Sequence, residues 1–267
     1  MRLITQAVAS NLFQQFTKVY VSFMISSPIY SALAPTGKLR VGINYGNPVL
    51  AMRDPSSGEL SGVVVDLARE LGRRTGLPVE LVGFESAGKM VEGLQANAWD
   101  VAFLAVDPGR ESEISFTAPY IEIEGTYLVP PGSALHAIAD IDRDGVRVGV
   151  SGKSAYDLFL SRSFKHAQLV RASSPEAAFE LIVAGKVDVL GGVRQHLVAN
   201  AAKLPGSRVL EGRFMAIQQA LGIPKEHEAG VNYLREFIED VKASGLVAKA
   251  IEKAGVRGVS IPPRITE

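Results

Sequence analysis

The chain has 267 residues, of which 47% are hydrophobic, so it can bury a core as one large domain or as two smaller ones. It contains no cysteine, which excludes disulfides and thiolate metal sites. Its 28 basic and 28 acidic residues cancel, so the chain lacks the positive charge that nucleic-acid binding requires, and we expect no nucleic-acid partner.

Residues 1–34 have the features of an export signal. Positive charge comes early, the apolar stretch 19–30 follows, and Ala32-Leu33-Ala34 gives the small-x-small pattern of a cleavage site. The apolar stretch is too short to span a bilayer. We therefore expect a signal peptide over 1–34 and a mature protein that is free in the periplasm. The alternatives are a buried first helix and a misassigned start codon.

The next part of the chain predicts a first α/β unit. Strands are expected at 39–43, 79–82 and 101–106, with helices at 63–75 and 88–96 between them. The first helix has one apolar face and ends at a glycine, which is typical of a helix C-terminus. The order β-α-β-α-β implies a parallel sheet with right-handed crossovers.

The same order returns further along the chain. Strands are expected at 146–150, 169–171 and 187–190, and the first helix at 154–164. The second helix has Ser174 as its cap and a proline in its first position. In both halves an aspartate opens the third strand, Asp100 and Asp188. The repeat predicts two similar lobes.

Two extended segments, 123–129 and 214–221, are expected to join the lobes, and a helix at about 230–244 returns to the first lobe. The predicted fold class is therefore α/β and two-lobed, each lobe having a mixed, mostly parallel sheet flanked by helices. Lobe 1 is expected to comprise residues 38–125 plus 219–263, and lobe 2 residues 126–218. Two crossings suit a hinge that closes on a ligand in the cleft.

Arg110 is the first candidate for ligand binding. It follows the strand 101–106 and the turn Asp107-Pro108-Gly109, and ligands of open α/β sheets lie at the carboxyl ends of strands. A guanidinium there is suited to hold a carboxylate with two parallel hydrogen bonds. The equally weighted alternative is a surface ion pair with Glu111 or Glu113.

Several segments together resemble a known family. These are residues 39–43 (LRVGI), 60–68 (LSGVVVDLA), 110–120 (RESEISFTAPY) and 147–150 (RVGV), followed by Ser154-Ala155-Tyr156. In order and spacing they are similar to the periplasmic solute-binding proteins of amino-acid ABC importers, the bacterial family 3 group with the type II periplasmic binding fold. The resemblance implies that Arg110 grips the carboxylate of the solute. It also implies that backbone amides around Ser154 and Ala155, at a helix start, meet the same carboxylate.

The sequence departs from the family pattern at the positions that usually bind the α-ammonium group of an amino-acid ligand. Asn44 and Val193 stand where amino-acid binders usually have acids, and Ala87 stands where an aromatic side chain often covers the ligand. A buried ammonium without a carboxylate costs several kcal/mol. We therefore expect an organic acid or a modified amino acid rather than a plain α-amino acid. The predicted ligand-binding residues are Asn44, Tyr45, Ala105, Arg110, Ser154, Ala155 and Arg194. For Arg194 a solvated helix start, and for Tyr45 a packed loop residue, are equally open.

The resemblance predicts the substrate-binding component of an ABC importer, a monomer whose partners are a carboxylate solute and a membrane permease. We expect no catalysis, no cofactor and no metal, since the four histidines show no metal-ligand spacing and Arg147 stands where a phosphate-binding loop needs glycine. The alternatives are a dehydratase-like periplasmic enzyme on the same scaffold and a ligand-sensing receptor module.

Overall fold

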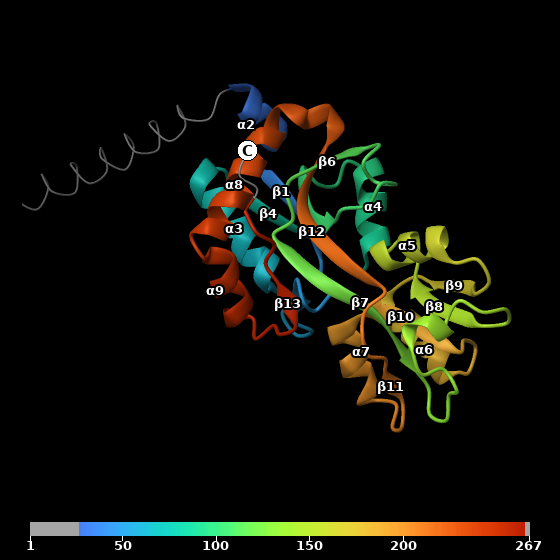
Figure 1. Cartoon of the computed structure of the whole chain (residues 1–267). Helices are drawn as coiled ribbons and strands as arrows, with labels where there is room; N and C mark the ends of the chain where they lie inside the picture. Colours follow the sequence, from blue (N-terminus) through green and yellow to red (C-terminus); the bar gives the residue numbers. More distant parts are fainter. Residues whose placement is uncertain (1–26, 265–267) are drawn as a thin grey trace, which may run out of the picture.

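The computed structural model describes residues 27–264, which form two lobes that are joined by a pair of long strands (Figure 1). Lobe 1 combines the start and the end of the described chain. Its elements are α2 (Ser27–Leu33), β1 (Leu39–Asn44), β2 (Met52–Arg53), β3 (Leu60–Ser61), α3 (Val63–Thr75), β4 (Val79–Phe84), α4 (Ala87–Gln95), β5 (Val101–Ala105), β6 (Ile114–Phe116), η2 (Lys225–Gly230), α8 (Val231–Ala243), α9 (Leu246–Lys253) and β13 (Val259–Ser260).

Lobe 2 is formed by the middle of the chain, and the strands β7 and β12 lead into and out of it. These two strands and the elements of lobe 2 are β7 (Ile121–Val129), η1 (Ile138–Asp140), β8 (Arg147–Ser151), α5 (Ala155–Ser163), β9 (Gln168–Ala172), α6 (Pro175–Val183), β10 (Val189–Val193), α7 (Arg194–Ala201), β11 (Arg208–Val209) and β12 (Met215–Pro224).

One sheet runs through both lobes in the order β4-β1-β5-β12-β7-β10-β8-β9. Within each lobe the strands of the repeated unit are parallel: β1 pairs with β4 and β5, and β8 pairs with β9 and β10. The middle strands β12 and β7 are antiparallel to each other and to their neighbours β5 and β10. The predicted α/β, two-lobed class is thus confirmed. In the sheet, the parallel strands of lobe 1 and those of lobe 2 are separated by the antiparallel pair β12 and β7.

The strands β7 and β12 cross between the lobes at the two segments expected to do so. They pair over Met215↔Gly125 to Gln219↔Ile121, and β13 adds a third strand to this crossing by pairing with β7 at Ile123 and Glu122. Two strands that connect lobes in this way can act as a hinge.

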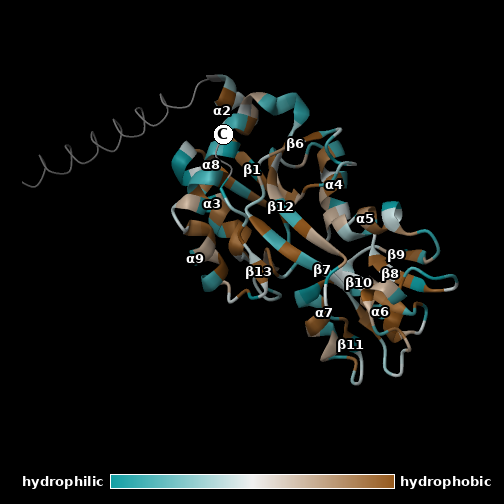
Figure 2. Cartoon of the chain, viewed as in Figure 1, coloured by the Kyte–Doolittle hydropathy of each residue, from teal (hydrophilic) through white to brown (hydrophobic). Residues whose placement is uncertain are grey.

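The helices α3 and α8 pack on one face of the lobe 1 sheet, and α9 packs on both of these helices (Figure 2). The helix α3 has the predicted bounds. Its apolar residues Val64, Leu67 and Leu71 are fully buried, and Gly76 follows its last residue with a φ of 70°. Glycine adopts this left-handed backbone conformation without a steric cost, and the helix therefore ends at Gly76. On the other face, α4 packs Met90 against Trp99.

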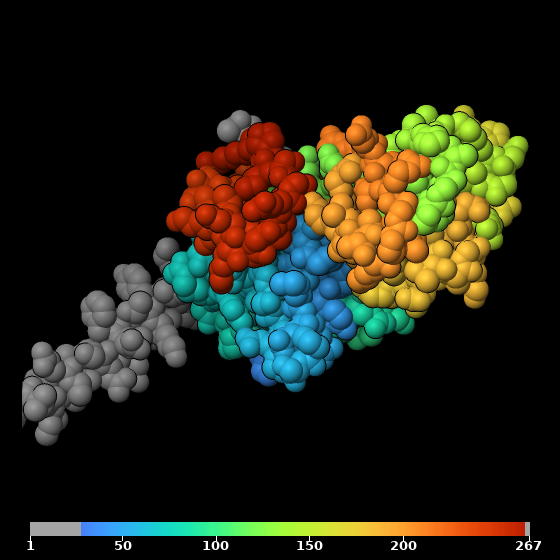
Figure 3. All heavy atoms as spheres, turned by 90° about the horizontal axis from the view of Figure 1, so that it is seen from below, coloured from blue at the N-terminus to red at the C-terminus, as the bar shows by residue number. Residues whose placement is uncertain are grey.

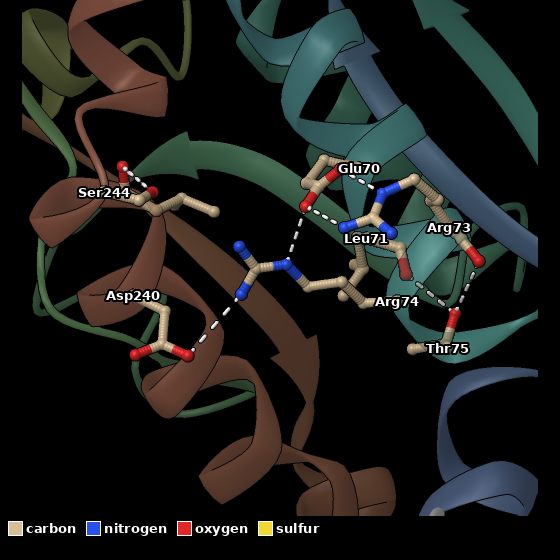
Figure 4. Close-up of polar contacts among 9 residues, drawn as sticks. Glu70, Leu71, Arg73, Arg74, Thr75, Asp240 and Ser244 are labelled. Atoms are coloured by element: carbon tan, nitrogen blue, oxygen red, sulfur yellow. Dashed lines mark hydrogen bonds and ion pairs between the residues drawn. The ribbon is translucent and has the colours of Figure 1, made fainter. Parts of the chain in front are cut away.

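Polar contacts connect the helix α8, near the end of the chain, to α3 (Figure 4). Glu70 accepts hydrogen bonds from Arg73 at 2.7 Å and from Arg74 at 2.8 Å, and Arg74 also forms an ion pair with Asp240 of α8 at 3.5 Å. The hydrogen bond from Arg73 lowers the pKa of Glu70 to about 2, although partial burial opposes this shift. The C-terminal part of the chain therefore lies against the N-terminal part, as the space-filling view shows (Figure 3).

The aspartates that open the third strand of each repeat have the same role in both lobes. Asp100 accepts hydrogen bonds from the backbone amide of Arg40 at 2.9 Å and from its guanidinium at 2.6 Å. Asp188 accepts the corresponding bonds from Arg147 at 2.9 and 2.8 Å. Each carboxylate thus joins the first strand of its lobe to the third.

The helix α9 was not predicted, and α7 was anticipated only as the helix start left open for Arg194. The helix α7 starts directly after β10, with Val193 in the cap position and no side chain to cap it, so no start signal marks it in the sequence. The helix α9 follows α8 after Gly245, whose φ of 74° turns the chain between them. These short helices are held by packing against β7 and α3 rather than by local signals.

The expected cleavage motif lies at the end of α2. Ala32, Leu33 and Ala34 are buried, and α2 packs against η2 close to Gly230 and Ile223. The expected cleavage site thus packs on lobe 1 in this structure, and the signal peptide over 1–34 stays a prediction. The remainder of the expected signal peptide, residues 1–26, lies outside the described residues. Within residues 27–264, no helix is both long and apolar enough to cross a bilayer.

Candidate functional site

A pocket of about 50 Å³ lies where the two lobes and the crossing strands meet. One water needs about 10–15 Å³ by this kind of measure, so the space corresponds to a few water-sized groups. The wall contains residues from both lobes and from β12, and these are Asn44, Gly46, Asn47, Pro48, Ala87, Met90, Phe103, Leu104, Ala105, Arg110, Ser151, Ser154, Ala155, Tyr156, Pro175, Val193, His196, Ile217 and Gln219.

Arg110 is the charged centre of this pocket. Only 4% of the residue is exposed, its Nη1 donates to the Ala105 carbonyl at 2.7 Å, and its Nη2 donates across the lobe boundary to the Lys153 carbonyl at 2.9 Å. Its Nε is buried without a partner. Because both neighbours are backbone carbonyls, the Nε–Nη2 edge remains suited to a carboxylate.

No acidic side chain among the described residues lies within ion-pair distance of Arg110, so the alternative pairing with Glu111 or Glu113 is not found. Burial lowers the pKa of the Arg110 guanidinium to about 10, although the nearby charge of Asp107 opposes the shift. A buried cation that lacks a counter-ion is electrostatically incomplete, which is the charge environment that suits an anion.

The start of α5 forms a second part of the wall. Ser154 caps this helix by accepting a hydrogen bond from the Asp157 amide at 3.1 Å, and Asp157 in turn accepts one from the Lys153 amide at 2.8 Å. Lys153 has a φ of 58°, unusual for a residue with a side chain. This turn places Ser154 and Ala155 at the pocket, where the helix start adds partial positive charge.

Two asparagines of lobe 1 present hydrogen-bond donors to the pocket. The Oδ1 atom of Asn44 accepts from the Gly46 amide, and that of Asn47 accepts from the Val49 amide, each at 3.1 Å. Since both oxygens are engaged, the NH₂ groups are the parts of these side chains that can meet a solute. Such donors suit a solute rich in oxygen acceptors.

Gln219 and His196 line the pocket but were not predicted as site residues. Gln219 lies on β12, directly opposite Ala105 of β5, and its Oε1 is buried without a partner. Its inward direction follows from the alternation along β12, because its neighbour Gln218 is exposed. His196 follows β10 on α7, and burial lowers the pKa of its imidazole.

Two predicted residues, Tyr45 and Arg194, are not among the residues that line this pocket. Tyr45 is outside the pocket wall, with the Arg53 guanidinium 5.5 Å from its ring centre. Arg194 donates to Glu124 at 2.6 Å and to the carbonyls of Leu210 and Gly212, so its charge is used to join α7 to β7 and to the chain before β12. The structure does bring Asn44, Ala105, Arg110, Ser154 and Ala155 together in one wall, and their contact with a solute stays a prediction.

No aspartate or glutamate is among the described residues that line the pocket. The wall thus offers one buried cation and several neutral donors but no anion. Elsewhere within residues 27–264, no three side chains of histidine, aspartate or glutamate gather as a metal-binding group.

The lobes touch each other at the rim of the pocket. Asp107 of lobe 1, whose side chain is nearly fully buried, forms an ion pair with Arg162 of lobe 2 at 2.7 Å. Glu92 pairs with Lys153 at 3.1 Å. These contacts, with the hydrogen bond from Arg110 to lobe 2, hold the lobes in a closed arrangement.

We expect Arg162→Met to reduce the closed fraction of the free protein. The substitution keeps the unbranched stem but leaves the Asp107 carboxylate without its partner, and exposed or half-exposed pairs contribute up to about 1 kcal/mol, or roughly fivefold in a population. Because the chain has no cysteine, Glu80→Cys in lobe 1 and Lys186→Cys in lobe 2 allow specific dye labelling, and energy transfer between the dyes reports closure.

The matched control is Arg69→Met, which removes an ion pair with Glu59 inside lobe 1. It should leave energy transfer unchanged. Equal transfer in the Arg162→Met protein and the parent would show that this pair does not hold the lobes together.

Comparisons with known proteins place these features in context. Residues 39–256 match the model of the bacterial extracellular solute-binding proteins, family 3. The virulence sensor protein BvgS of Bordetella pertussis is 30% identical over 180 residues, which is 64% of this chain. The chain spans only 14% of the length of that sensor.

Two further comparisons cover most of both proteins. The histidine-binding periplasmic protein of Escherichia coli K12 is 22% identical over 251 residues, 88% of this chain and 96% of the relative. The solved structure of a putative binding component of an ABC transporter from Wolinella succinogenes, complexed with lysine, is 24% identical. It superposes with a TM-score of 0.70 over 82% of this chain and 95% of that one.

Proposed function

Because the chain belongs to the bacterial extracellular solute-binding proteins of family 3, we propose that it captures a small carboxylate-bearing solute between its lobes and presents it to the membrane permease of an ABC importer. The observation that carries this proposal is Arg110, a buried guanidinium without an acidic partner in the pocket between the lobes. Export to the periplasm, where family members act, is part of the same proposal.

The proposed solute lacks an α-ammonium group. The described pocket wall has no carboxylate to pair with one, and Asn44 and Val193 both line the pocket at the positions where the family pattern suggested acids. Leaving an ammonium unpaired in this buried site costs several kcal/mol, whereas a neutral organic chain has no such cost. An organic acid therefore suits the wall better than a plain amino acid.

We assign binding rather than catalysis to the pocket. An enzyme needs an acid–base group beside the bound carboxylate, and the one titratable side chain in the wall that could act near neutral pH is His196, whose pKa is lowered by burial. A polar wall with one cation and several neutral donors is the composition of a binding site.

The similarity to the BvgS sensor favours a second candidate function, a ligand-sensing module that acts on a receptor rather than on an importer. The same closure on the same solute would serve either function. Co-purification from membranes with solute present distinguishes them, because an importer component should recover a permease and a sensor module should recover a signalling receptor.

A thermal-shift screen of the full chain tests the class of solute. We expect organic acids to raise the melting temperature more than the common α-amino acids do. A ligand at 100 times its dissociation constant adds about 2.7 kcal/mol to the free energy of unfolding. Larger shifts with histidine, lysine or glutamine than with any organic acid would overturn the proposed solute class.

A further inference from the structure

Two residues of the pocket wall, Arg110 and Gln219, each carry a buried polar atom without a partner, and the two atoms are opposite in character. Arg110 Nε is a hydrogen-bond donor, Gln219 Oε1 is an acceptor, and neither atom has a partner in the structure. Only 4% of Arg110 and 5% of Gln219 are exposed. An unsatisfied buried polar group costs about 1–3 kcal/mol, so each atom calls for a ligand group.

The two residues are linked through one residue pair of the sheet. Gln219 pairs with Ala105 across β12 and β5, and the Ala105 carbonyl accepts a hydrogen bond from Arg110 Nη1 at 2.7 Å. Side chains of paired residues lie on the same face, with Cβ atoms about 4.5–5.5 Å apart. Gln219 and Arg110 both line the pocket, so a solute held there can reach both residues.

The acceptor on Gln219 differs from the other amides of the wall. The oxygens of Asn44 and Asn47 are engaged by backbone amides, so these side chains offer donors. Gln219 Oε1 alone among these three amide oxygens is left to accept. A solute that gives every polar group of the wall a hydrogen-bond partner must therefore donate one hydrogen bond to Gln219 and accept hydrogen bonds from the other groups.

The chemistry of that donor is restricted. An ammonium would bring a charge for which the described wall has no counter-ion, whereas a hydroxyl donates one hydrogen bond without adding charge and can accept from a neighbouring NH₂ group. The pocket volume of about 50 Å³ restricts the solute to few heavy atoms.

Building on the proposed function, we propose that the solute is a short hydroxycarboxylate, whose carboxylate pairs with Arg110 and whose hydroxyl donates to Gln219. Gln219 is then the residue that determines specificity for the hydroxyl. A site built to hydrogen-bond a hydroxyl rejects the analogue that lacks it, because the buried acceptor is left unpaired.

Calorimetry on the full chain tests this with matched pairs of probes. Lactate and propionate differ only in the 2-hydroxyl, 3-hydroxybutyrate and butyrate differ only in the 3-hydroxyl, and alanine replaces the hydroxyl of lactate with an ammonium. We expect at least one hydroxy acid to bind tenfold or more tightly than its deoxy partner, and alanine to bind more weakly than lactate.

Gln219→Met keeps the length of the side chain and removes its acceptor. In this variant the hydroxy acid and its deoxy partner should bind equally. The matched control is Gln218→Met, one residue earlier on β12 and exposed, where the preference should persist. The melting temperature of each free variant verifies that the fold is retained.

The outcomes separate this inference from the proposed function. If, in the parent protein, each hydroxy acid binds only as tightly as its deoxy analogue, the proposed recognition of the hydroxyl is wrong, whereas the proposed capture of a carboxylate still holds. If the preference survives in Gln219→Met, the role of Gln219 fails. If alanine binds more tightly than every acid, or if no acid binds, both the inference and the proposed solute class fail.

Discussion

Replacing Arg110 with methionine is expected to weaken binding of the carboxylate solute by about a hundredfold to a few thousandfold. The substitution leaves a buried carboxylate without its charged partner, and breaking such a pair costs about 3–5 kcal/mol, with each 1.4 kcal/mol equal to a factor of ten. The measurement is calorimetric titration with the acid that gives the largest thermal shift. Affinity equal to that of the parent protein would remove Arg110 from the binding site.

The same substitution should leave the free protein about as stable as the parent. Arg110 is buried without an acidic partner, and its lowered pKa shows that desolvation of the charge dominates its environment. Methionine removes the desolvation cost of the buried charge. It also removes the two hydrogen bonds to Ala105 and Lys153, which contribute about 1 kcal/mol each. Urea unfolding of the solute-free variant measures the balance.

Arg110→Lys is the matched control, because it keeps the charge and loses the planar fork. We expect its affinity to fall between those of the parent and the methionine variant. If lysine binds no better than methionine, the geometry of the fork matters more than its charge. If lysine binds as well as arginine, a two-bond contact with the carboxylate is excluded.

The fold could be predicted from the sequence because its signals are local and repeated. The helix 63–75 has an apolar face and a glycine stop, and Ser174 caps the next lobe's second helix with the hydrogen bond expected of it. The lengths of the short helices α7 and α9 could not be predicted, since neither helix has a capping side chain and both depend on packing, α7 against β7 and α9 against the helices α3 and α8.

The pocket could be predicted only where a residue's position in a strand or at a helix start fixes its direction. Arg110 and Ser154 were found for this reason. The ion pair of Arg194 could not be predicted, because its partner, Glu124, is 70 residues away in the sequence and nothing local indicates the pair. Gln219 was missed because its direction depends on the register between β12 and β5, which local patterns do not specify.

The repeated aspartates give a second prediction, in which the same substitution has unequal effects in the two lobes. The Asp100 side chain is 0% exposed and that of Asp188 is 38% exposed, although both join the first and third strands of a lobe through an arginine. We expect Asp100→Asn to lower the free energy of unfolding by about 3–5 kcal/mol, because it leaves the largely buried Arg40 guanidinium without its counter-charge.

Asp188→Asn is expected to cost at most about 1 kcal/mol, because water already solvates much of its pair with Arg147. Urea unfolding followed by circular dichroism measures both variants. If the lobes unfold in separate steps, Asp100→Asn should shift only the transition of lobe 1. Both aspartates lie outside the pocket wall, so solute affinity serves as the control and should be unchanged in either variant that folds. Equal losses of stability would mean that the shared hydrogen-bond pattern, rather than burial, sets the strength of this strand-joining contact.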